Sequence, residues 1–269
     1  MDIYFGIDGT GPDDNDTYKT DFQSSHVRQL FEQWHTPLAG YLRGPRWHGT
    51  GTPAKSKQGL DWVVEQWEKQ QKLATVRSAL SAKPTRIFLS GYSRGGAAVI
   101  ELAYNLNKKG IPVHCMMLFD AVDRSPLENC DTISKNVAMV YHALRDPKAG
   151  SRESFGNCGL KHPSKGLPVF RKFFCTHGGV GGCPWDKAGK SGKIEEMSTK
   201  AKIGAVAAMG KHLADIHDFT NVTVAQDKAG ALASWQWMQS NLRVARATGL
   251  DKSIGNVGDF NLRSDIMLG

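Results

Sequence analysis

Thr85-Arg-Ile-Phe-Leu-Ser-Gly-Tyr-Ser-Arg-Gly-Gly-Ala-Ala-Val-Ile-Glu-Leu-Ala-Tyr104 is the stretch of the chain that decides its fold. It begins with a short run of strand-forming residues, Ile87 to Leu89, and glycines follow directly. After the glycines, apolar residues recur at the spacing of one helix face, at Val99, Leu102, Ala103 and Leu106. The pattern predicts a buried strand, a sharp turn and a helix.

The turn itself, Gly91-Tyr-Ser-Arg-Gly95, spells G-x-S-x-G. A serine on such a turn takes a strained backbone conformation, and the glycines two positions either side let strand and helix pass close together. The Ser93 hydroxyl then stands above the sheet as a nucleophile, and the Arg94 N–H points to where a tetrahedral intermediate carries its negative oxygen. Tyr92 is a candidate substrate-binding residue. The alternative is an ordinary turn in which the serine caps the helix.

The length and composition indicate one globular domain. The 269 residues fit one large α/β domain or two small ones, and 40% of them are hydrophobic. We expect a single domain over residues 1–269, with a mostly parallel central sheet, helices on both faces and a helical C-terminal part from about residue 200. No apolar run is long enough to span a membrane. The N-terminus lacks the pattern of a secretory signal peptide, so we expect a protein that is cytoplasmic as synthesised.

The charge of the chain suggests an anionic partner. The formal net charge is +8 and the pI is about 9.2. An anionic membrane surface or a nucleic acid would satisfy this charge, and a solvated basic surface is the alternative. Because the lysines and arginines form no long run and no recognisable nucleic-acid module, we expect no nucleic-acid partner.

The five cysteines form no C-x-x-C pair, which argues against a zinc ribbon and a thioredoxin-like redox site. Cys115 lies in an apolar run and is expected in the core. Cys158, Cys175 and Cys183 fall in loop-rich sequence, where one disulfide or free thiols are both compatible with the odd number of cysteines.

The first predicted strand, Ile3 to Ile7, runs into the glycine-containing loop Asp8 to Asp16. A strand that ends in such a loop is well placed to supply the second donor to an oxyanion, and we assign this role to the backbone N–H of Gly9 or Thr10. Asp8 is expected to hold the loop in shape and is also a candidate for substrate binding.

A calcium site is the alternative for this loop, because the carboxylates of Asp13, Asp14 and Asp16 are crowded. The spacing of an EF-hand, with its distant glutamate, is absent. We therefore expect no metal site and no cofactor.

The remaining pattern alternates helices and strands. We expect a helical stripe over residues 22–40, a loop from Tyr41 to Pro53, a helix from Gly59 to Leu80, strands from Val113 to Phe119 and from Asn136 to Ala143, an exposed loop from Lys187 to Ser198, and helices from Ala201 to Phe219 and from Ala225 to Thr248. Trp235 and Trp237 in the last helix are expected in the core rather than in a membrane.

An acid and a base follow the serine in the order Ser, Asp, His, which is the order of α/β-hydrolases. Asp120 directly follows a predicted strand, at the edge where the carboxyl ends of parallel strands collect; Asp123 is the near alternative. His177 lies in a glycine-rich loop that can reach across the sheet, and is the expected base. The other candidates for the base are His142, which we place at a strand end, and two histidines of a predicted helix, His212 and His217.

These motifs resemble, in the same order, those of the bacterial α/β-hydrolase family typified by the type VI secretion phospholipase effectors. The F-x-D-G-T strand of the family resembles Phe5 to Thr10, its G-x-G-T segment resembles His48 to Thr52, and its G-F-S-R-G elbow resembles Gly91 to Gly95. Its W-D-T-V, H-A-L-x-D and H-S-D-V-G-G motifs are similar to Phe119 to Val122, His142 to Asp146 and His177 to Gly182.

By this resemblance Ser93 is the nucleophile, Asp120 the orienting acid and His177 the base, in an α/β-hydrolase-like fold. The acidic residue two positions after the histidine of the family is Gly179 here, so the carboxylate is missing or moved. The resemblance also implies a secretion-system or immunity partner and delivery to the periplasm of a target cell. The chain is too short for the membrane-binding modules of the large effectors.

The sequence as a whole predicts a serine ester hydrolase that acts on a lipid or another acyl ester. Two alternatives stay open: a small-ester or polyester hydrolase without a membrane role, and a binding module that keeps the fold without catalysis.

Overall fold

The fold is a parallel sheet between two layers of helices. The computed structural model describes residues 1–46, 51–76, 84–123, 130–153, 155–196 and 220–248. Within that part of the chain, six strands form one sheet in the order β2-β1-β3-β4-β5-β6, and every neighbouring pair is parallel. The strands are β1 (Asp2–Ile7), β2 (Ala39–Leu42), β3 (Arg86–Tyr92), β4 (Val113–Phe119), β5 (Val137–Arg145) and β6 (Val169–Phe173).

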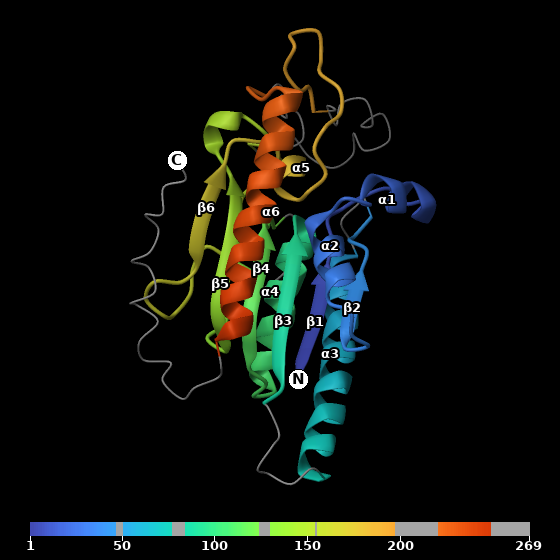
Figure 1. Ribbon diagram of the computed structural model, residues 1–269, viewed down its shortest axis with the longest axis vertical. Coiled ribbons are helices and arrows are strands. Elements are labelled where there is room, and N and C mark those ends of the chain that lie inside the picture. Colours follow the sequence, from blue (N-terminus) through green and yellow to red (C-terminus); the bar gives the residue numbers. More distant parts are fainter. Residues whose placement is uncertain (47–50, 77–83, 124–129, 154, 197–219, 249–269) are drawn as a thin grey trace, which may run out of the picture.

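Helices cover both faces of this sheet. They are α1 (Asn15–Asp21), α2 (His26–Gln33), α3 (Thr52–Val76), α4 (Arg94–Lys108), α5 (His177–Val180) and α6 (Val224–Ala247), with a 3-10 turn, η1, at Pro147–Ala149. Figure 1 shows α2 and α6 in front of the strands and α4 behind them. The predicted α/β-hydrolase-like architecture, a parallel sheet with helices on both sides, is confirmed.

The two faces of the sheet belong to two separate cores, as the alternation of side chains along a strand requires. In β3, Ile87 and Leu89 are buried on the face covered by α3 and α4. Phe88, between them, is buried on the face covered by α2 and α6. Trp235 and Trp237 of α6 pack against this second core, as expected.

The order of the strands determines where a site can form. The chain passes from β1 outward to β2 and then returns to add β3 on the other side of β1. Such a reversal leaves a crevice outside the carboxyl ends of the two central strands, where α/β proteins bind their ligands. The loops after β1, β3, β4 and β6 all leave the sheet at this edge.

The sequence prediction missed strand β2. Residues 39–42 were expected to straddle the end of a helix and the start of a loop, but they pair with β1, from Tyr4 opposite Ala39 to Ile7 opposite Leu42. A side chain at Gly40 would place its Cβ 2.6 Å from the ring of Phe5. The strand is short, and a glycine that tertiary packing requires interrupts the strand-forming residues, so the local pattern was too weak to reveal it.

Other boundaries also differ. Helix α3 begins at Thr52 rather than Gly59, and residues 22–40 hold only one helix, α2, after α1 ends at Asp21. Strand β5 continues to Arg145, so His142 lies inside it and not at its end. Helix α6 agrees with the prediction, whereas the helix expected from Ala201 to Phe219 lies outside the described residues.

The segment before residue 197 is less exposed than expected. Ile194 and Glu196, in the loop predicted from Lys187 to Ser198, are buried.

All five cysteines are free thiols, and the thiol of Cys158 is hydrogen-bonded to Cys130 rather than paired with Cys175 or Cys183. The described helices include none that is long and apolar enough to cross a membrane.

Candidate active site

Ser93 stands on a strained turn between β3 and α4. Its backbone has φ 55° and ψ −129°, a conformation that non-glycine residues seldom adopt and that is typical of functional turns. A Cβ at Gly91 would lie 2.6 Å from the carbonyl oxygen of Gly95, and a Cβ at Gly95 would lie 2.2 Å from that of Asp8. Both glycines of the motif are therefore required by close backbone contacts. The alternative of a capping serine is wrong, because the Ser93 side chain makes no capping hydrogen bond.

The Ser93 hydroxyl is hydrogen-bonded to a histidine. His177 begins α5, and its Nε2 lies 2.9 Å from Ser93 Oγ. Its Nδ1 lies 2.6 Å from Oδ2 of Asp120, the residue that follows β4. If Nδ1 donates to the carboxylate, Nε2 is the acceptor for the serine proton, which is the arrangement a general base needs. The three side chains expected to meet at this edge of the sheet do so.

The alternatives for the acid and the base have other partners. Asp123 accepts a hydrogen bond from the thiol of Cys130. His142 is fully buried in β5, where its Nε2 accepts the N–H of Ala121 at 3.1 Å. Burial lowers the pKa of His142 to about 4, so its ring is neutral and structural. His212 and His217 lie outside the described residues.

The charges of the site are arranged to keep the acid ionised and the base neutral. Burial alone would raise the pKa of Asp120, but the charge of Arg145 and the hydrogen bond of His177 outweigh burial and hold that pKa well below its usual range. For His177 burial is the largest effect and lowers the pKa; Asp120 raises it, and Arg145 and Arg152 lower it further. The net pKa of His177 lies below its usual range, so the ring is a free base at neutral pH.

The loop after β1 lies beside Ser93. Arg94 Nη1 is 3.4 Å from Thr10 Oγ1, and α4 approaches this loop closely at Gly95. The Gly9 N–H donates to Oδ1 of its neighbour Asp8 at 2.8 Å and is thus engaged. This leaves the Thr10 N–H as the donor that we expect from this loop, with the Arg94 N–H at the start of α4 as the other.

Asp8 holds this loop in shape, as expected, and does so from inside the protein. Its side chain is fully buried, and its carboxylate accepts hydrogen bonds from Gly9 N, from Ser25 Oγ and from the Tyr41 hydroxyl. Burial is the main effect on Asp8 and raises its pKa to about 6. Contact between Asp8 and a substrate, the other expectation, does not fit a carboxylate with no exposed surface.

Tyr92 forms part of the wall behind the histidine. Its ring lies 5.1 Å from that of His177, and Cβ atoms added at Gly9 or Gly181 would lie 2.5 Å and 2.4 Å from it. The ring is 5% exposed, so most of its surface supports His177 and the two neighbouring loops. Contact with a substrate stays a prediction for this residue.

Several groups that hold the acid and the base were not found from the sequence. Asn157 donates from Nδ2 to Oδ1 of Asp120 at 2.8 Å. The backbone N–H of His177 donates to Ser151 Oγ at 2.8 Å, and that hydroxyl donates to buried Glu196. None of these residues belongs to a motif with its own chemistry, so no sequence signal marks them.

A carboxylate does lie beside Gly179, but it comes from helix α6. Asp227 is fully buried and accepts hydrogen bonds from Thr176 N at 2.6 Å, from Thr176 Oγ1 and from Trp185 N. A Cβ at Gly179 would lie 2.3 Å from Oδ1 of Asp227, so a side chain at position 179 and this carboxylate exclude one another. Asp227 thus occupies the space that a side chain at position 179 would need.

We expect Asp227→Asn to destabilise the segment that carries His177. The amide has one acceptor oxygen for two backbone donors and a hydroxyl, so at least one buried donor loses its partner at a cost of about 1–3 kcal/mol. The free energy of unfolding, measured with urea, checks this. Asp186→Asn, a change at an exposed neighbouring acid, is the control. Equal stability of the two variants would contradict the role of Asp227.

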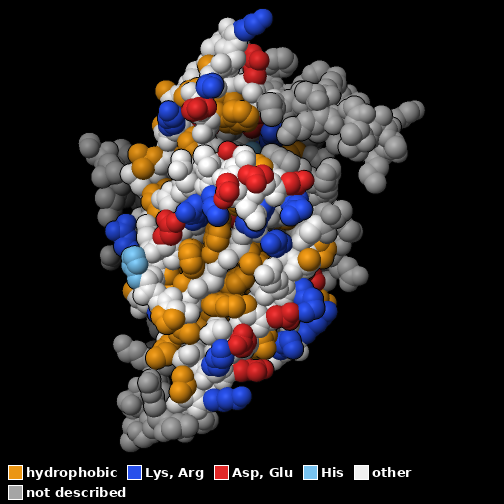
Figure 2. Space-filling model, turned by 90° about the vertical axis from the view of Figure 1, so that its right-hand side faces the viewer, with side chains coloured by type: hydrophobic (Ala, Val, Ile, Leu, Met, Phe, Trp, Pro, Cys, Tyr) orange, Lys and Arg blue, Asp and Glu red, His pale blue; other side chains and the backbone are white. Residues whose placement is uncertain are grey.

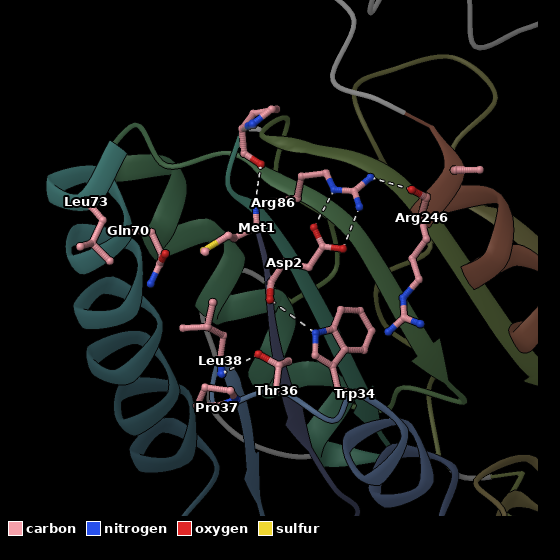
Figure 3. A pocket seen from close by; sticks show the side chains of 12 residues that line it. Met1, Asp2, Trp34, Thr36, Pro37, Leu38, Gln70, Leu73, Arg86 and Arg246 are labelled. Atoms are coloured by element: carbon pink, nitrogen blue, oxygen red, sulfur yellow. Dashed lines mark hydrogen bonds and ion pairs between the residues drawn. The ribbon is translucent and has the colours of Figure 1, made fainter. Parts of the chain in front are cut away.

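A cavity of about 880 Å³ lies elsewhere in the described part of the structure. It opens at the amino ends of β1 and β3, where Arg86 pairs with Asp2 and Arg246 lies over the ring of Trp34 (Figure 3). Ser93 stands at the carboxyl end of β3, the opposite edge of the sheet. This cavity is therefore not the place where the serine would act.

In the described part of the chain, no cluster of histidine, cysteine and acidic side chains is arranged to bind a metal ion.

Comparisons with known proteins show similarity at the level of the fold alone. No protein-family model and no curated protein matches the sequence. Among solved structures, an uncharacterized protein from Pseudomonas aeruginosa aligns with a TM-score of 0.40 and 14% identity, over 67% of this chain and 41% of the other. The Tle1 effector, bound to the VgrG spike of a type 6 secretion system, aligns with a TM-score of 0.39 and 12% identity, over 70% of this chain and 52% of the other.

A protein from Xanthomonas campestris pv. campestris, assigned to the alpha/beta hydrolase superfamily, aligns with a TM-score of 0.31 and 14% identity, over 88% of this chain and 98% of the other. The chain thus spans about half or less of the first two proteins. At these identities and scores the alignments say nothing of activity. The α/β-hydrolase-like fold is established by the parallel sheet and by the elbow between β3 and α4.

Proposed function

We propose that this protein is a serine hydrolase that cleaves carboxylic esters through an acyl-enzyme. The observation that carries the proposal is the continuous hydrogen-bonded chain from Ser93 Oγ through His177 to Asp120, built on a strained elbow at the carboxyl edge of the sheet. A binding module that keeps the fold without catalysis would not require a nucleophile, a base and an acid that are buried and hydrogen-bonded to one another in this order.

The first half of the reaction forms the acyl-enzyme. His177 Nε2 takes the proton of the Ser93 hydroxyl as Oγ bonds to the ester carbonyl carbon, and Asp120 stabilises the imidazolium. The negative oxygen is bound by the N–H groups of Arg94 and Thr10, each such donor typically lowering the barrier by about 3 kcal/mol. The bond to the alkoxy group then breaks, and His177 gives it the proton.

The second half releases the acid. Water takes the place of the alcohol, loses its proton to His177 Nε2 and attacks the acyl carbon; when the carbon–oxygen bond to Ser93 breaks, the serine recovers the proton. Every proton passes through the one imidazole, so no group beyond those described is needed.

A lipid is the ester that we propose as substrate. The resemblance to phospholipase effectors and the net charge of +8 support it, as they support a membrane surface, a secretion-system or immunity partner and delivery to a periplasm as further proposals. The face of the molecule in Figure 2 gives no separate support for membrane binding, because lysines and arginines alternate there with acids. On α2 and α3, charged side chains form ion pairs: Arg28 with Glu32, Lys57 with Asp61 and Lys69 with Glu65.

Ester chain length separates the lipid proposal from its rival, a small-ester or polyester hydrolase. We expect kcat/KM for p-nitrophenyl esters to rise from acetate to the long acyl chains, and phospholipid vesicles to release fatty acid. Ser93→Ala, assayed in parallel, removes background hydrolysis. Highest activity on acetate with no release from vesicles would favour the rival.

A further inference from the structure

The guanidinium of Arg145 connects the acid of the site to the loop that covers the base. Arg145 ends β5, beside the end of β4, where Phe119 pairs with Ala143. Its Nη1 donates to Oδ2 of Asp120 at 2.5 Å, and its backbone N–H donates to Oδ1 at 3.3 Å. The side chains of the pair are 8% and 0% exposed. An ion pair buried to this extent forms only where its geometry offsets the loss of water around both charges.

The other side of the guanidinium faces the loop after η1. Nη2 of Arg145 donates to the carbonyl oxygens of Arg152, at 3.1 Å, and of Phe155. The Phe155 ring stands edge-on to the imidazole of His177 at a centroid distance of 5.4 Å. The planar guanidinium of Arg145 therefore fixes two neighbours of the imidazole: the Asp120 carboxylate, which is bonded to Nδ1, and the Phe155 ring, which packs beside it.

We propose that Arg145 is a positioning residue of this site: it holds the Asp120 carboxylate toward His177 and, through the carbonyl oxygens of Arg152 and Phe155, fixes the Phe155 ring against the imidazole. The inference rests on the proposed hydrolase function and adds a component that the Ser, Asp, His order does not contain. In the motif H-A-L-x-D, position 145 is the one that the family pattern leaves open.

The charge of Arg145 has a consequence for the pH dependence of the site. The positive charge of Arg145 partly offsets the negative charge of Asp120, so the carboxylate stabilises the imidazolium of His177 less. Arg145 therefore lowers the pKa of His177 and favours the neutral base. The charged and titratable groups around His177 come from six parts of the chain: Tyr92 of β3, Asp120 after β4, Arg145 of β5, Arg152 after η1, Glu196 bonded to Ser151, and Asp227 of α6 bonded to Thr176. Of these, Arg145 is the cation bonded directly to the acid of the site.

The test is the rate of covalent labelling by a fluorophosphonate as a function of pH, which needs no knowledge of the ester substrate. In labelling, Ser93 Oγ bonds to phosphorus, fluoride leaves and His177 takes the serine proton, so the rate rises with pH through the pKa of the imidazole. We expect Arg145→Gln to move this rise to higher pH by about 1 unit. We also expect Arg145→Gln to lower the plateau rate, because the Asp120 carboxylate and the Phe155 carbonyl lose the guanidinium that donates hydrogen bonds to them.

Two further variants separate charge from position. Arg145→Lys keeps the cation but loses the planar fork, so the rise should stay at the wild-type pH while the plateau rate falls. Arg171→Gln, at an exposed cation on the neighbouring strand β6, should match the wild type in both respects.

Near-UV circular dichroism establishes which variants are folded. A folded Arg145→Gln protein whose rise in rate is not displaced would overturn the proposal. If Arg145→Gln does not fold, Arg145→Lys becomes the test of the proposal. A plateau rate for Arg145→Lys equal to that of the wild type would then overturn the proposal. Wild-type protein that is never labelled would be a failure of the hydrolase function itself, and the inference would fall with it.

Discussion

Ser93→Ala is expected to abolish covalent labelling by a fluorophosphonate and to lower ester hydrolysis by about 10⁶-fold, the loss typical when a serine hydrolase loses its nucleophile. The variant removes the one oxygen that bonds to the substrate, and His177 Nε2 then has no hydroxyl to deprotonate. Labelling is followed by intact mass, and hydrolysis by release of p-nitrophenol.

The fold should survive this change. The Ser93 hydroxyl makes no capping bond to α4, and the strained backbone at φ 55° is favoured by neither serine nor alanine. Ser90→Ala is the matched control, because Ser90 lies three residues before Ser93, in β3, and its hydroxyl is bonded to Tyr4 in the core. Labelling of Ser93→Ala at the wild-type rate would contradict the role of Ser93, whereas wild-type protein that binds esters without turnover would favour the binding module.

Asp120→Asn is expected to reduce kcat by about 10⁴-fold, because an amide stabilises the wrong tautomer of the histidine and offers no charge to the imidazolium. The structure adds a second effect that is specific to this site. The buried guanidinium of Arg145 loses its counterion, and an uncompensated charge of this kind costs about 3–5 kcal/mol of stability. Both activity and the free energy of unfolding should therefore fall together.

Two measurements distinguish this result from simple unfolding. Labelling rates are compared with those of Asp123→Asn, a change at the neighbouring acid that bonds Cys130 instead of His177. Circular dichroism and urea unfolding give the folded fraction of each variant. If Asp120→Asn stays folded and labels as fast as Asp123→Asn, Asp120 does not orient the base.

The chemistry of the candidate site followed from short-range patterns, and its supporting groups did not. Ser93 and Asp120 were predicted because each follows a recognisable strand, and parallel strands bring their carboxyl ends to one edge. His177 was predicted because it lies in a glycine-rich loop that can reach across that edge. Asn157 and Asp227 reach the site through hydrogen bonds that span 37 and 51 residues of sequence. An asparagine in loop-like sequence, or an aspartate in the first turn of a predicted helix, gives no indication of such a partner.

Strand β2 and Asp8 show the same limit within the fold. Gly40 is a poor strand former, and it lies in β2 because the ring of Phe5 leaves no room for a Cβ. Asp8 was expected to shape its loop and does so, but its burial behind Ser25 and Tyr41, which removes it from a substrate, depends on residues 17 and 33 positions away.

The sequence by itself determined the strand, elbow and helix around Ser93 and the edge of the sheet where an acid and a base would join it. These features depend on backbone conformations that neighbouring residues dictate. Only the tertiary structure decided which groups surround the acid and the base: Arg145 and Asn157 at Asp120, Ser151 and Asp227 around His177. A buried charge must be offset by whatever partner the folded chain brings within reach, and that choice is made by packing in three dimensions.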